Sequence, residues 1–352
     1  AGLPEPDLPQ MLPQMAPPSF LQEAPSVTDP RSPLAQDEIN RWPSMHLWGP
    51  EDLAPLPPMP GAQERQMSEE PLEDLSDMMA SYKTFGLHQD GNCWTYREWL
   101  PNTKAAFLIG EFNAWDKEAT PLTPDPELED VWGCRIQGPQ GQALKKGQKY
   151  KLYVVQADGR EVYPTPAWAT RMVFTKELGV FDAVAWPLEK QQTSGPVIPP
   201  QSSSERIYEC HLGLAFRKGK GKSFEEAAEV LIPRVVQSGY TAMLLLGIQE
   251  CKEYSSMGAQ PVAYFAPTAW LGSPEAFQAF VAKAHQAGLR VYLSVSHDGA
   301  AGCDDGLGQQ YFRTEMTEDP ITGSRIFDYD HPEVVRFLLS NLAFWMSEYG
   351  ID

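Results

Sequence analysis

The stretch SPEAFQAFVAKAHQAGLRVYLSVSHDGAAG, residues 273–302, decides the fold class of the second half of this chain. Its first part predicts a helix, because Ser273 is a good N-cap, Pro274 suits the first helical position and apolar residues recur at helical spacing. The following LRVYLSV (289–295) is typical of a buried strand, and the polar loop after it carries His297. Helix, buried strand and polar loop in this order indicate one unit of a parallel α/β fold.

The same alternation continues on both sides of this stretch. Further strand and helix candidates are RIYECHLG (206–213), SFEEAAEVLIPRVVQSG (223–239), YTAMLLLG (240–247) and HPEVVRFLLSNLAFWMSEYG (331–350). The strands are unbroken apolar runs joined by long crossovers, which predicts parallel strands covered by helices. Both a doubly wound sheet and a (β/α)8 barrel have this rhythm. The first strand is not followed by a G-x-G-x-x-G fingerprint, which counts against a dinucleotide-binding sheet.

Residues 81–187 show a different pattern, with short alternating runs separated by turn signals. The runs are NCWTYREWLP (92–101), KAAFLIGEF (104–112), DVWGCRIQG (130–138), QKYKLYVVQAD (148–158) and REVYPT (160–165). Their spacing predicts an all-β sandwich. The stretch 188–204, rich in Ser, Pro and Gln, has linker composition, so residues 205–352 form the next domain.

Residues 1–80 contain 16 of the 33 prolines, no lysine, and 14 acidic residues against three arginines. Such a segment cannot bury enough apolar surface to offset the entropy of ordering, which predicts a largely disordered acidic arm. Two roles remain open for this arm: a solvated tail, or an arm that contacts other proteins.

Composition narrows the function classes. The formal net charge of −19 argues against a nucleic-acid partner, and no apolar run approaches the ~20 residues of a membrane span. The five cysteines are scattered without C-x-x-C spacing, which predicts neither a metal site nor disulfides and favours a reducing compartment. The chain begins AGLPEP without the features of a signal peptide, so secretion is not expected.

An ordered series of segments carries a resemblance to a known family. The segments are FLIGEFNAWDKEATPL (107–122), YKLYVVQADGREVYPTPAWA (150–169), RIYECHLGLA (206–215), LIPRVVQSGYTAMLLLGIQE (231–250), YFAPTAWLGSPEAFQAFVAKAHQAGLRVYL (264–293) and RFLLSNLAFWMSEYGID (336–352). They resemble α-1,4-glucan branching enzymes of the α-amylase superfamily, from about Tyr82 to Asp352. The resemblance implies an immunoglobulin-like carbohydrate-binding sandwich and then the first three βα units of a (β/α)8 barrel. It also implies an α-glucan substrate such as starch, glycogen or maltooligosaccharide, a retaining transfer that forms α-1,6 branches, and no cofactor.

Within the sandwich, Phe112, Asn113 and Trp115 match the family's F-N-x-W signature. Aromatic faces stack on sugar rings, while amide or ammonium groups bind the hydroxyls. The candidate sugar-binding residues are therefore Trp115, Asn113, Lys151 and Tyr163. The other interpretation is that this module mainly braces the barrel, with Trp99, Trp132 and Trp168 packed inside it or at the domain seam.

The barrel part contains polar residues at the predicted strand ends, where barrel enzymes place active-site groups. Glu209 and His211 match the family's E-x-H-x-G stretch, Glu250 follows the second strand, and His297 matches one position of the D-V-V-x-x-H segment. The resemblance makes these four residues candidates for substrate binding or for support of the cleft.

Three family positions are altered. The substrate-stacking tyrosine is replaced by Ala259, the aspartate of the third strand by Ser294, and the last histidine of its motif by Gly299. The family's nucleophile and acid/base glutamate are expected beyond Asp352, so no catalytic side chain is assigned within the chain. This pattern is similar to a divergent plant and algal branching-enzyme-like subgroup with altered motifs, which implies a photosynthetic source.

Three functions remain open after this comparison of motifs. Family descent favours a glucan branching transferase. The altered motifs and the acidic arm favour a non-catalytic glucan-binding or scaffold protein that contacts other starch enzymes, and an amylase-like hydrolase is the weakest alternative. The expected compartment is the cytoplasm or the plastid stroma.

Overall fold

The computed structural model describes residues 75–137, 144–188, 204–215, 223–252, 258–301, 306–314 and 323–352. All of them belong to the compact unit Glu69–Asp352. The arm predicted for residues 1–80 lies outside the described residues as far as residue 74, and most of the linker predicted at 188–204 lies outside them too. The domain boundaries drawn from the sequence therefore stay a prediction.

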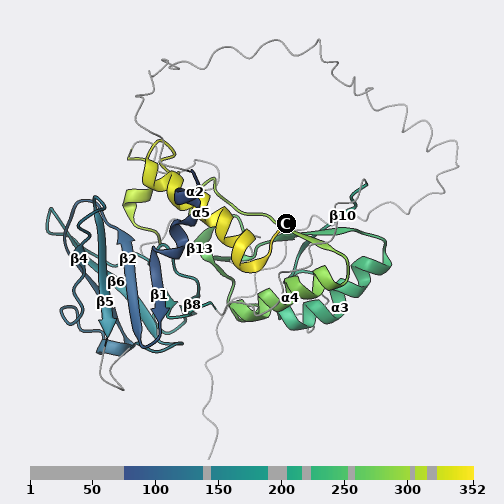
Figure 1. Cartoon of the computed structure of the whole chain (residues 1–352), viewed down its shortest axis with the longest axis horizontal. Coiled ribbons are helices and arrows are strands. Elements are labelled where there is room, and N and C mark those ends of the chain that lie inside the picture. The colour runs from purple at the N-terminus through teal and green to yellow at the C-terminus, as the bar shows by residue number, and fades with distance from the viewer. Residues whose placement is uncertain are drawn as a thin grey trace, which may run out of the picture. The chain divides into compact units, whose positions relative to one another are not determined.

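Two antiparallel sheets form a β-sandwich in the first described part of the chain (Figure 1), which confirms the fold expected from the alternating pattern. One sheet has the order β1-β2-β5-β4, and the other has the order β3-β6-β9-β8 with β7 paired to β6. The strands are β1 (Gly86–Asp90), β2 (Cys93–Trp99), β3 (Thr103–Gly110), β4 (Thr123–Pro124), β5 (Val131–Gln137), β6 (Lys149–Gln156), β7 (Glu161–Val162), β8 (Met172–Thr175) and β9 (Val180–Val184).

Alternation along the strands separates the core of the sandwich from its outer face. Trp94 and Tyr96 of β2 and Tyr150 and Leu152 of β6 are buried in one cluster. Because successive side chains of a strand point to opposite faces, the lysines interleaved with Tyr150 and Leu152 on β6 lie on the outer face of the second sheet. This outer face carries the candidate site described below.

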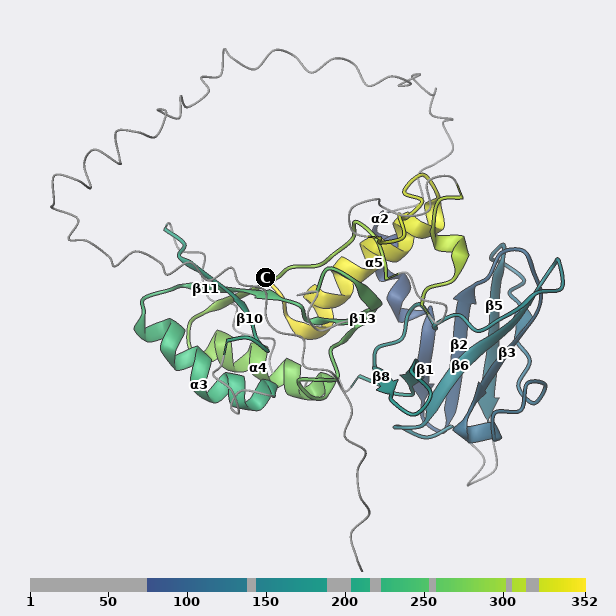
Figure 2. The ribbon, with the colours of Figure 1, turned by 180° about the vertical axis from the view of Figure 1, so that it is seen from behind.

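The second half contains a three-stranded parallel sheet of order β10-β11-β14, with helices between its strands (Figures 1 and 2). In chain order the elements are β10 (Ile207–His211), α3 (Phe224–Gln237), β11 (Ala242–Leu246), β12 (Gln249–Cys251), β13 (Pro261–Pro267), α4 (Pro274–Gln286), β14 (Arg290–Leu293), the 3₁₀ turn η4 (Gln309–Tyr311) and α5 (Pro332–Tyr349). Sequential parallel strands with crossover helices confirm the three predicted βα units. No helix within the described ranges is long and apolar enough to cross a membrane.

Helix boundaries follow the capping signals in the sequence. Ser223 accepts a hydrogen bond from the backbone N of Glu226 (3.1 Å), and Ser273 accepts one from the backbone N of Ala276 (3.2 Å). Gly350 ends α5 with φ of 69°, a left-handed value that glycine adopts without a steric cost. The predicted starts of α3 and α4 are thus confirmed.

The segment between β11 and α4 contains elements that the sequence analysis did not identify, since it named no strand between YTAMLLLG (240–247) and the helix that begins after Ser273. Its described residues contain an antiparallel pair of strands, β12 and β13, with irregular register at Gln249 and Glu250. All residues of β13 are buried. Since this strand is hydrophobic on both sides, the sequence contains no alternation by which it could be recognised as part of a hairpin.

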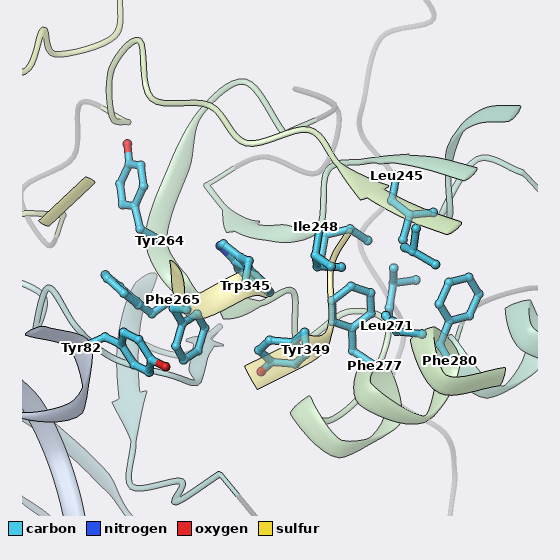
Figure 3. Close-up of a cluster of buried hydrophobic side chains, with 14 of the residues drawn as sticks. Tyr82, Leu245, Ile248, Tyr264, Phe265, Leu271, Phe277, Phe280, Trp345 and Tyr349 are labelled. Carbon is cyan, nitrogen blue, oxygen red and sulfur yellow. The ribbon is translucent and has the colours of Figure 1, made fainter. Parts of the chain in front are cut away.

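Aromatic side chains from both halves share one buried cluster, part of which Figure 3 shows. Phe265 of β13 lies 4.9 Å, centroid to centroid, from Trp168 of the sandwich segment and 5.1 Å from Phe344 of α5. The helix α2 (Leu75–Ala80) packs on α5, and the 3₁₀ turn η1 (Ser81–Lys83) brings Tyr82 to 5.5 Å from Phe344. The sandwich and the βα units are therefore joined by a continuous apolar core.

A buried carboxyl group lies at this junction. Glu98 at the end of β2 is 1% exposed, and its oxygens accept hydrogen bonds from the Tyr96 hydroxyl (2.8 Å), the Ala167 backbone N (3.0 Å) and the Tyr311 hydroxyl (3.1 Å). Burial raises the pKa of Glu98 to about 7, although these three donors favour the ionised form. The carboxyl group thus connects the sandwich to the loop that contains η4.

We expect the free energy of unfolding to fall as the pH rises from about 4.5 to about 7, where the pKa of folded Glu98 lies. In this window the unfolded chain loses the Glu98 proton first, so the folded state binds more protons and its stability decreases with pH. A pKa difference of this size corresponds to about 3 kcal/mol. Glu98→Gln cannot ionise and should remove this part of the decrease, as measured by urea denaturation at pH 5 and pH 8.

Burial also raises the pKa of Glu250 to about 7, which adds a decrease of the same sign. That contribution is present in both the parent and the Glu98→Gln variant, so the difference between their two pH profiles reports Glu98 alone. Profiles that run parallel from pH 5 to pH 8 would show that Glu98 does not carry the effect.

Candidate functional site

A cleft of about 1680 Å³ opens along the outer face of the sheet β3-β6-β9-β8. Its lining comes from the turn between β2 and β3, the loop after β3, β6 and β9, the segment around β7, the turn between β8 and β9, and residues near η4. Three residues that the sequence singled out for sugar binding line it: Trp115, Lys151 and Tyr163. The structure thus brings them together from separate segments, and we call this the sandwich cleft.

Trp115 lies in the loop after β3 and is 39% exposed. Its backbone N donates to the carbonyl of Gly110 (2.8 Å), and its φ of 62° follows a φ of 56° at Ala114. Two successive non-glycine residues in the left-handed region are uncommon. This backbone leaves a large indole ring on the wall of the cleft, where its flat apolar face is available for stacking.

The polar part of the sandwich cleft is built around Asp182 of β9, whose side chain is 5% exposed. Its carboxylate lies 3.5 Å from Nζ of Lys151 and 3.4 Å from Nζ of Lys149, and it accepts a hydrogen bond from the Thr175 hydroxyl. Glu111, which also lines the cleft, supplies a second carboxylate, so that two ammonium groups are matched by two carboxylates. A neutral ligand rich in hydroxyl groups suits such a surface, because ammonium groups donate and carboxylates accept hydrogen bonds.

Tyr163 adds a second exposed aromatic ring to the same cleft, with 36% of its surface accessible. It stacks on Tyr153 at a centroid distance of 5.3 Å, and Nζ of Lys117 lies 5.2 Å from its ring centre. Lys117 also pairs with Glu161 at 3.2 Å. These contacts hold the ring in one orientation, as a binding surface requires.

Asn113 does not contribute its amide hydrogens to the sandwich cleft. Nδ2 donates to the carbonyl of Leu108 (2.9 Å) and to Oγ1 of Thr120 (3.1 Å), while Oδ1 accepts from the backbone N of Gly110 (2.9 Å). Both hydrogens of the amide are used within its own loop. The prediction that Asn113 fixes sugar hydroxyls therefore has no support in this geometry.

Glu250 and His211 approach one another at a second place, near the ends of β12 and β10, where they line a tight gap with no room for a water molecule. The Glu250 carboxylate accepts from the Ala269 backbone N (2.6 Å) and from the Thr268 hydroxyl (3.3 Å). Burial lowers the pKa of His211. Glu250 thus connects β12 to the residues that follow β13, and His211, which is 5% exposed, lines the same tight gap rather than an open cleft.

The two remaining candidates of the barrel part lie apart from this gap. Glu209 is exposed on β10. His297 donates from Nε2 to Oδ1 of Asn341 on α5 (2.8 Å), whose amide in turn donates to the Tyr264 carbonyl (2.7 Å). Burial lowers the pKa of His297, which favours the neutral ring. His297 therefore has a structural partner far away in the sequence.

The three positions predicted to differ from the family carry no carboxylate, imidazole or aromatic ring. Ala259 is exposed, and Ser294 is the exposed residue directly after β14. Gly299 is buried, and a Cβ atom there would lie 2.5 Å from the carbonyl oxygen of Arg325. The backbone of the 324–325 segment thus occupies the space that a side chain at residue 299 would need.

We expect Gly299→Ala to lower the free energy of unfolding by about 1–3 kcal/mol, since the new methyl group overlaps a backbone atom that cannot rotate away. Ser294→Ala is the matched control and should change stability by less than about 0.5 kcal/mol, because it alters an exposed side chain. Urea denaturation of both variants tests this. An unchanged unfolding midpoint for Gly299→Ala would mean that the 324–325 segment moves aside freely.

Sequence reasoning missed several residues of the sandwich cleft, among them Asp182 and Leu178. Leu178 lines the cleft with 73% of its surface exposed in the turn between β8 and β9. Asp182 lies among the apolar residues Phe181, Ala183 and Val184 of β9. An acidic residue inside an apolar strand indicates a paired or functional carboxylate, so the sequence did contain a signal for this residue. No pattern in the sequence marks Leu178.

Comparison with known proteins finds a family match for the sandwich and a shared fold for most of the chain. Residues 84–169 match the family model of carbohydrate-binding module 48, described as the isoamylase N-terminal domain. The fold is shared with a putative alpha amylase from Salmonella typhimurium, with a TM-score of 0.61 and 19% identity over 76% of this chain and 42% of that one. The catalytic module of the pneumococcal glycogen-degrading protein SpuA has a TM-score of 0.64, at 17% identity over 79% and 47% of the two chains. The chain thus contains a segment that matches carbohydrate-binding module 48, and it shares its fold with these two proteins.

Comparison by sequence finds relatives of higher identity than these solved structures. The 1,4-alpha-glucan-branching enzyme of Aspergillus oryzae is 37% identical over 293 residues, which cover 79% of this chain and 42% of that enzyme. The enzyme of the same name from Dictyostelium discoideum is 34% identical over 297 residues, or 82% and 44% of the two chains. The chain spans less than half the length of these curated relatives. Over the aligned residues it is similar to the 1,4-alpha-glucan-branching enzymes, which confirms the resemblance seen in its segments.

Proposed function

We propose that this chain binds α-glucan in the sandwich cleft. The observation that carries the proposal is the convergence of an exposed Trp115, an exposed Tyr163 and the Lys151–Asp182 pair on one cleft. Aromatic faces bind the apolar C–H surfaces of glucose rings, and the paired charges offer donors and acceptors to their hydroxyls. The match of residues 84–169 to a carbohydrate-binding module supports the same ligand class.

Affinity electrophoresis tests this proposal directly. The protein should migrate more slowly in a native gel that contains glycogen than in a gel without it, relative to a protein that does not bind glycogen. Added maltoheptaose should restore the mobility by competition. Equal migration in both gels would refute the proposed function.

A second candidate function is favoured by the relatives, which are named 1,4-alpha-glucan-branching enzymes. We propose as this alternative the transfer of α-1,4-glucan segments to form α-1,6 branches. Three residues weigh against it and in favour of glucan binding alone. Ser294, Ala259 and Gly299 supply no carboxylate, aromatic ring or imidazole at the altered positions. A loss of iodine absorbance from amylose incubated with the purified chain, without an increase in reducing ends, would instead establish branching activity, whereas a loss with new reducing ends would indicate hydrolysis.

Partners and compartment are part of this proposal. The acidic, proline-rich residues 1–80 are proposed to contact other enzymes of starch metabolism, which co-purification with and without residues 1–74 would test. No disulfide joins any of the four described cysteines, Cys93, Cys134, Cys210 and Cys251, which supports a reducing compartment such as the cytoplasm or the plastid stroma. Fractionation of the source cells would distinguish the two.

A further inference from the structure

The loop that carries Trp115 has a backbone that its own sequence does not favour. Ala114 and Trp115 have φ values of 56° and 62°, in the left-handed region that glycine and asparagine adopt most easily. Each such residue costs free energy and persists only where its surroundings hold it. Something other than the intrinsic preference of these two residues must therefore stabilise this conformation.

Asn113 directly precedes these residues and supplies that support. Its amide joins the end of β3 to the returning strand segment, through the Leu108 carbonyl and the Gly110 N on one side and the Thr120 hydroxyl on the other. The Leu108 carbonyl can only accept and the Gly110 N can only donate, so the orientation of the amide is determined by its partners. Asn113 acts as a clamp across the base of the loop.

The base of the loop is also fixed against β6. A Cβ atom at Gly110 would lie 2.4 Å from the Lys149 carbonyl oxygen, so the loop begins in close contact with the strand that carries the cleft lysines. Glu111 strengthens this contact, because Oε2 accepts from the backbone N of Lys149 (3.0 Å). The clamp therefore sets the position of Trp115 relative to Lys149 and Lys151.

We propose that Asn113 is a positioning residue for glucan binding, which holds the Trp115 ring on the wall of the sandwich cleft without touching the ligand. The inference rests on the proposed function, since it assigns a role within that site. Loss of the amide leaves the Leu108 carbonyl and the Gly110 N without their partner and frees the loop to leave the left-handed conformation. The affinity for maltoheptaose should fall about tenfold in Asn113→Ala, as a loss of about 1.4 kcal/mol implies.

The test combines binding with a signal from Trp115 itself. Proteins labelled with 5-fluorotryptophan are examined by ¹⁹F NMR, and the Trp115 line is assigned by its absence from Trp115→Phe. The parent should show one sharp Trp115 line, while Asn113→Ala should shift and broaden it even without glucan. Asn92→Ala, which changes an exposed asparagine in the turn between β1 and β2, is the matched control and should leave the line and the affinity unchanged.

A rescue variant separates positioning from direct binding of the sugar. Ala114→Gly in the Asn113→Ala background removes the Cβ penalty of the left-handed backbone and should recover part of the affinity. If Asn113 instead bonded the sugar itself, this glycine would not restore the affinity. If Asn113→Ala folds poorly, Thr120→Val removes one bond of the clamp and should give a smaller change in the same direction.

The outcomes separate this inference from the proposed function. Equal maltoheptaose affinity in the parent and in Trp115→Ala would refute the glucan site, while the Trp115 line would still report whether Asn113 holds the loop. Lost binding in Trp115→Ala, together with an unchanged Trp115 line and unchanged affinity in Asn113→Ala, would refute the positioning role.

Discussion

Replacing Phe337 by alanine is expected to lower the free energy of unfolding by about 3–5 kcal/mol. Phe337 of α5 is fully buried, and its ring centre lies 4.9 Å from that of Tyr311, 5.2 Å from that of Trp168 and 5.4 Å from that of Phe265. These partners come from the η4 turn, the sandwich segment and β13. Truncation would open a cavity where the two halves meet, so both halves should lose stability in one transition.

Urea denaturation followed by tryptophan fluorescence measures this effect. Leu342→Ala on the same helix is the matched control, because Leu342 is 39% exposed and its loss should cost less than about 1 kcal/mol. Similar unfolding midpoints for the two variants would contradict the central place of Phe337 in the core. Two separate transitions in the parent would show that the halves melt independently.

Replacing Trp115 by alanine is expected to abolish the retardation of the protein in glycogen gels. An aromatic side chain at the centre of a binding surface typically contributes about 2 kcal/mol or more, which corresponds to a roughly thirty-fold loss of affinity. The free energy of unfolding should change little, since Trp115 is 39% exposed and lies at the surface. Binding and stability therefore respond separately to this change.

Trp270→Ala is the control for this experiment. Trp270 is the more exposed of the two tryptophans, at 58%, and it does not line the sandwich cleft. It should keep the mobility of the parent. Equal retardation of Trp115→Ala and the parent, or an equal loss in both variants, would show that the cleft is not where glucan binds.

The sequence predicted the elements of the barrel part well, because local chemistry decides them. Ser223 and Ser273 mark their helix starts by hydrogen bonds to residues three positions later, and the parallel strands are continuous apolar runs. The hairpin of β12 and β13 was missed, since Gln249–Cys251 is short and β13 is buried throughout. Periodicity identifies an element only where its two faces differ.

The candidate site was predicted only in part, for reasons that involve contacts between distant residues. Trp115 and Lys151 line one cleft, as the motifs predicted. The motifs could not show that the amide of Asn113 donates both its hydrogens to Leu108 and Thr120. The bond between His297 and Asn341 likewise spans 44 residues. Motifs identify residues with suitable hydrogen-bonding or stacking groups. Only the tertiary fold shows which of these groups are already bonded to other parts of the protein.

Trp168 has a consequence for how this protein can be divided. It lies inside the span 84–169 that matches the carbohydrate-binding module, yet it packs against Phe265 and Phe337 of the second half. A polypeptide cut to that span would present the ring of Trp168, and with it Phe85, to water. We therefore expect residues 84–169 to unfold together with the strands they pack against, although the sequence match delimits them as a separate segment.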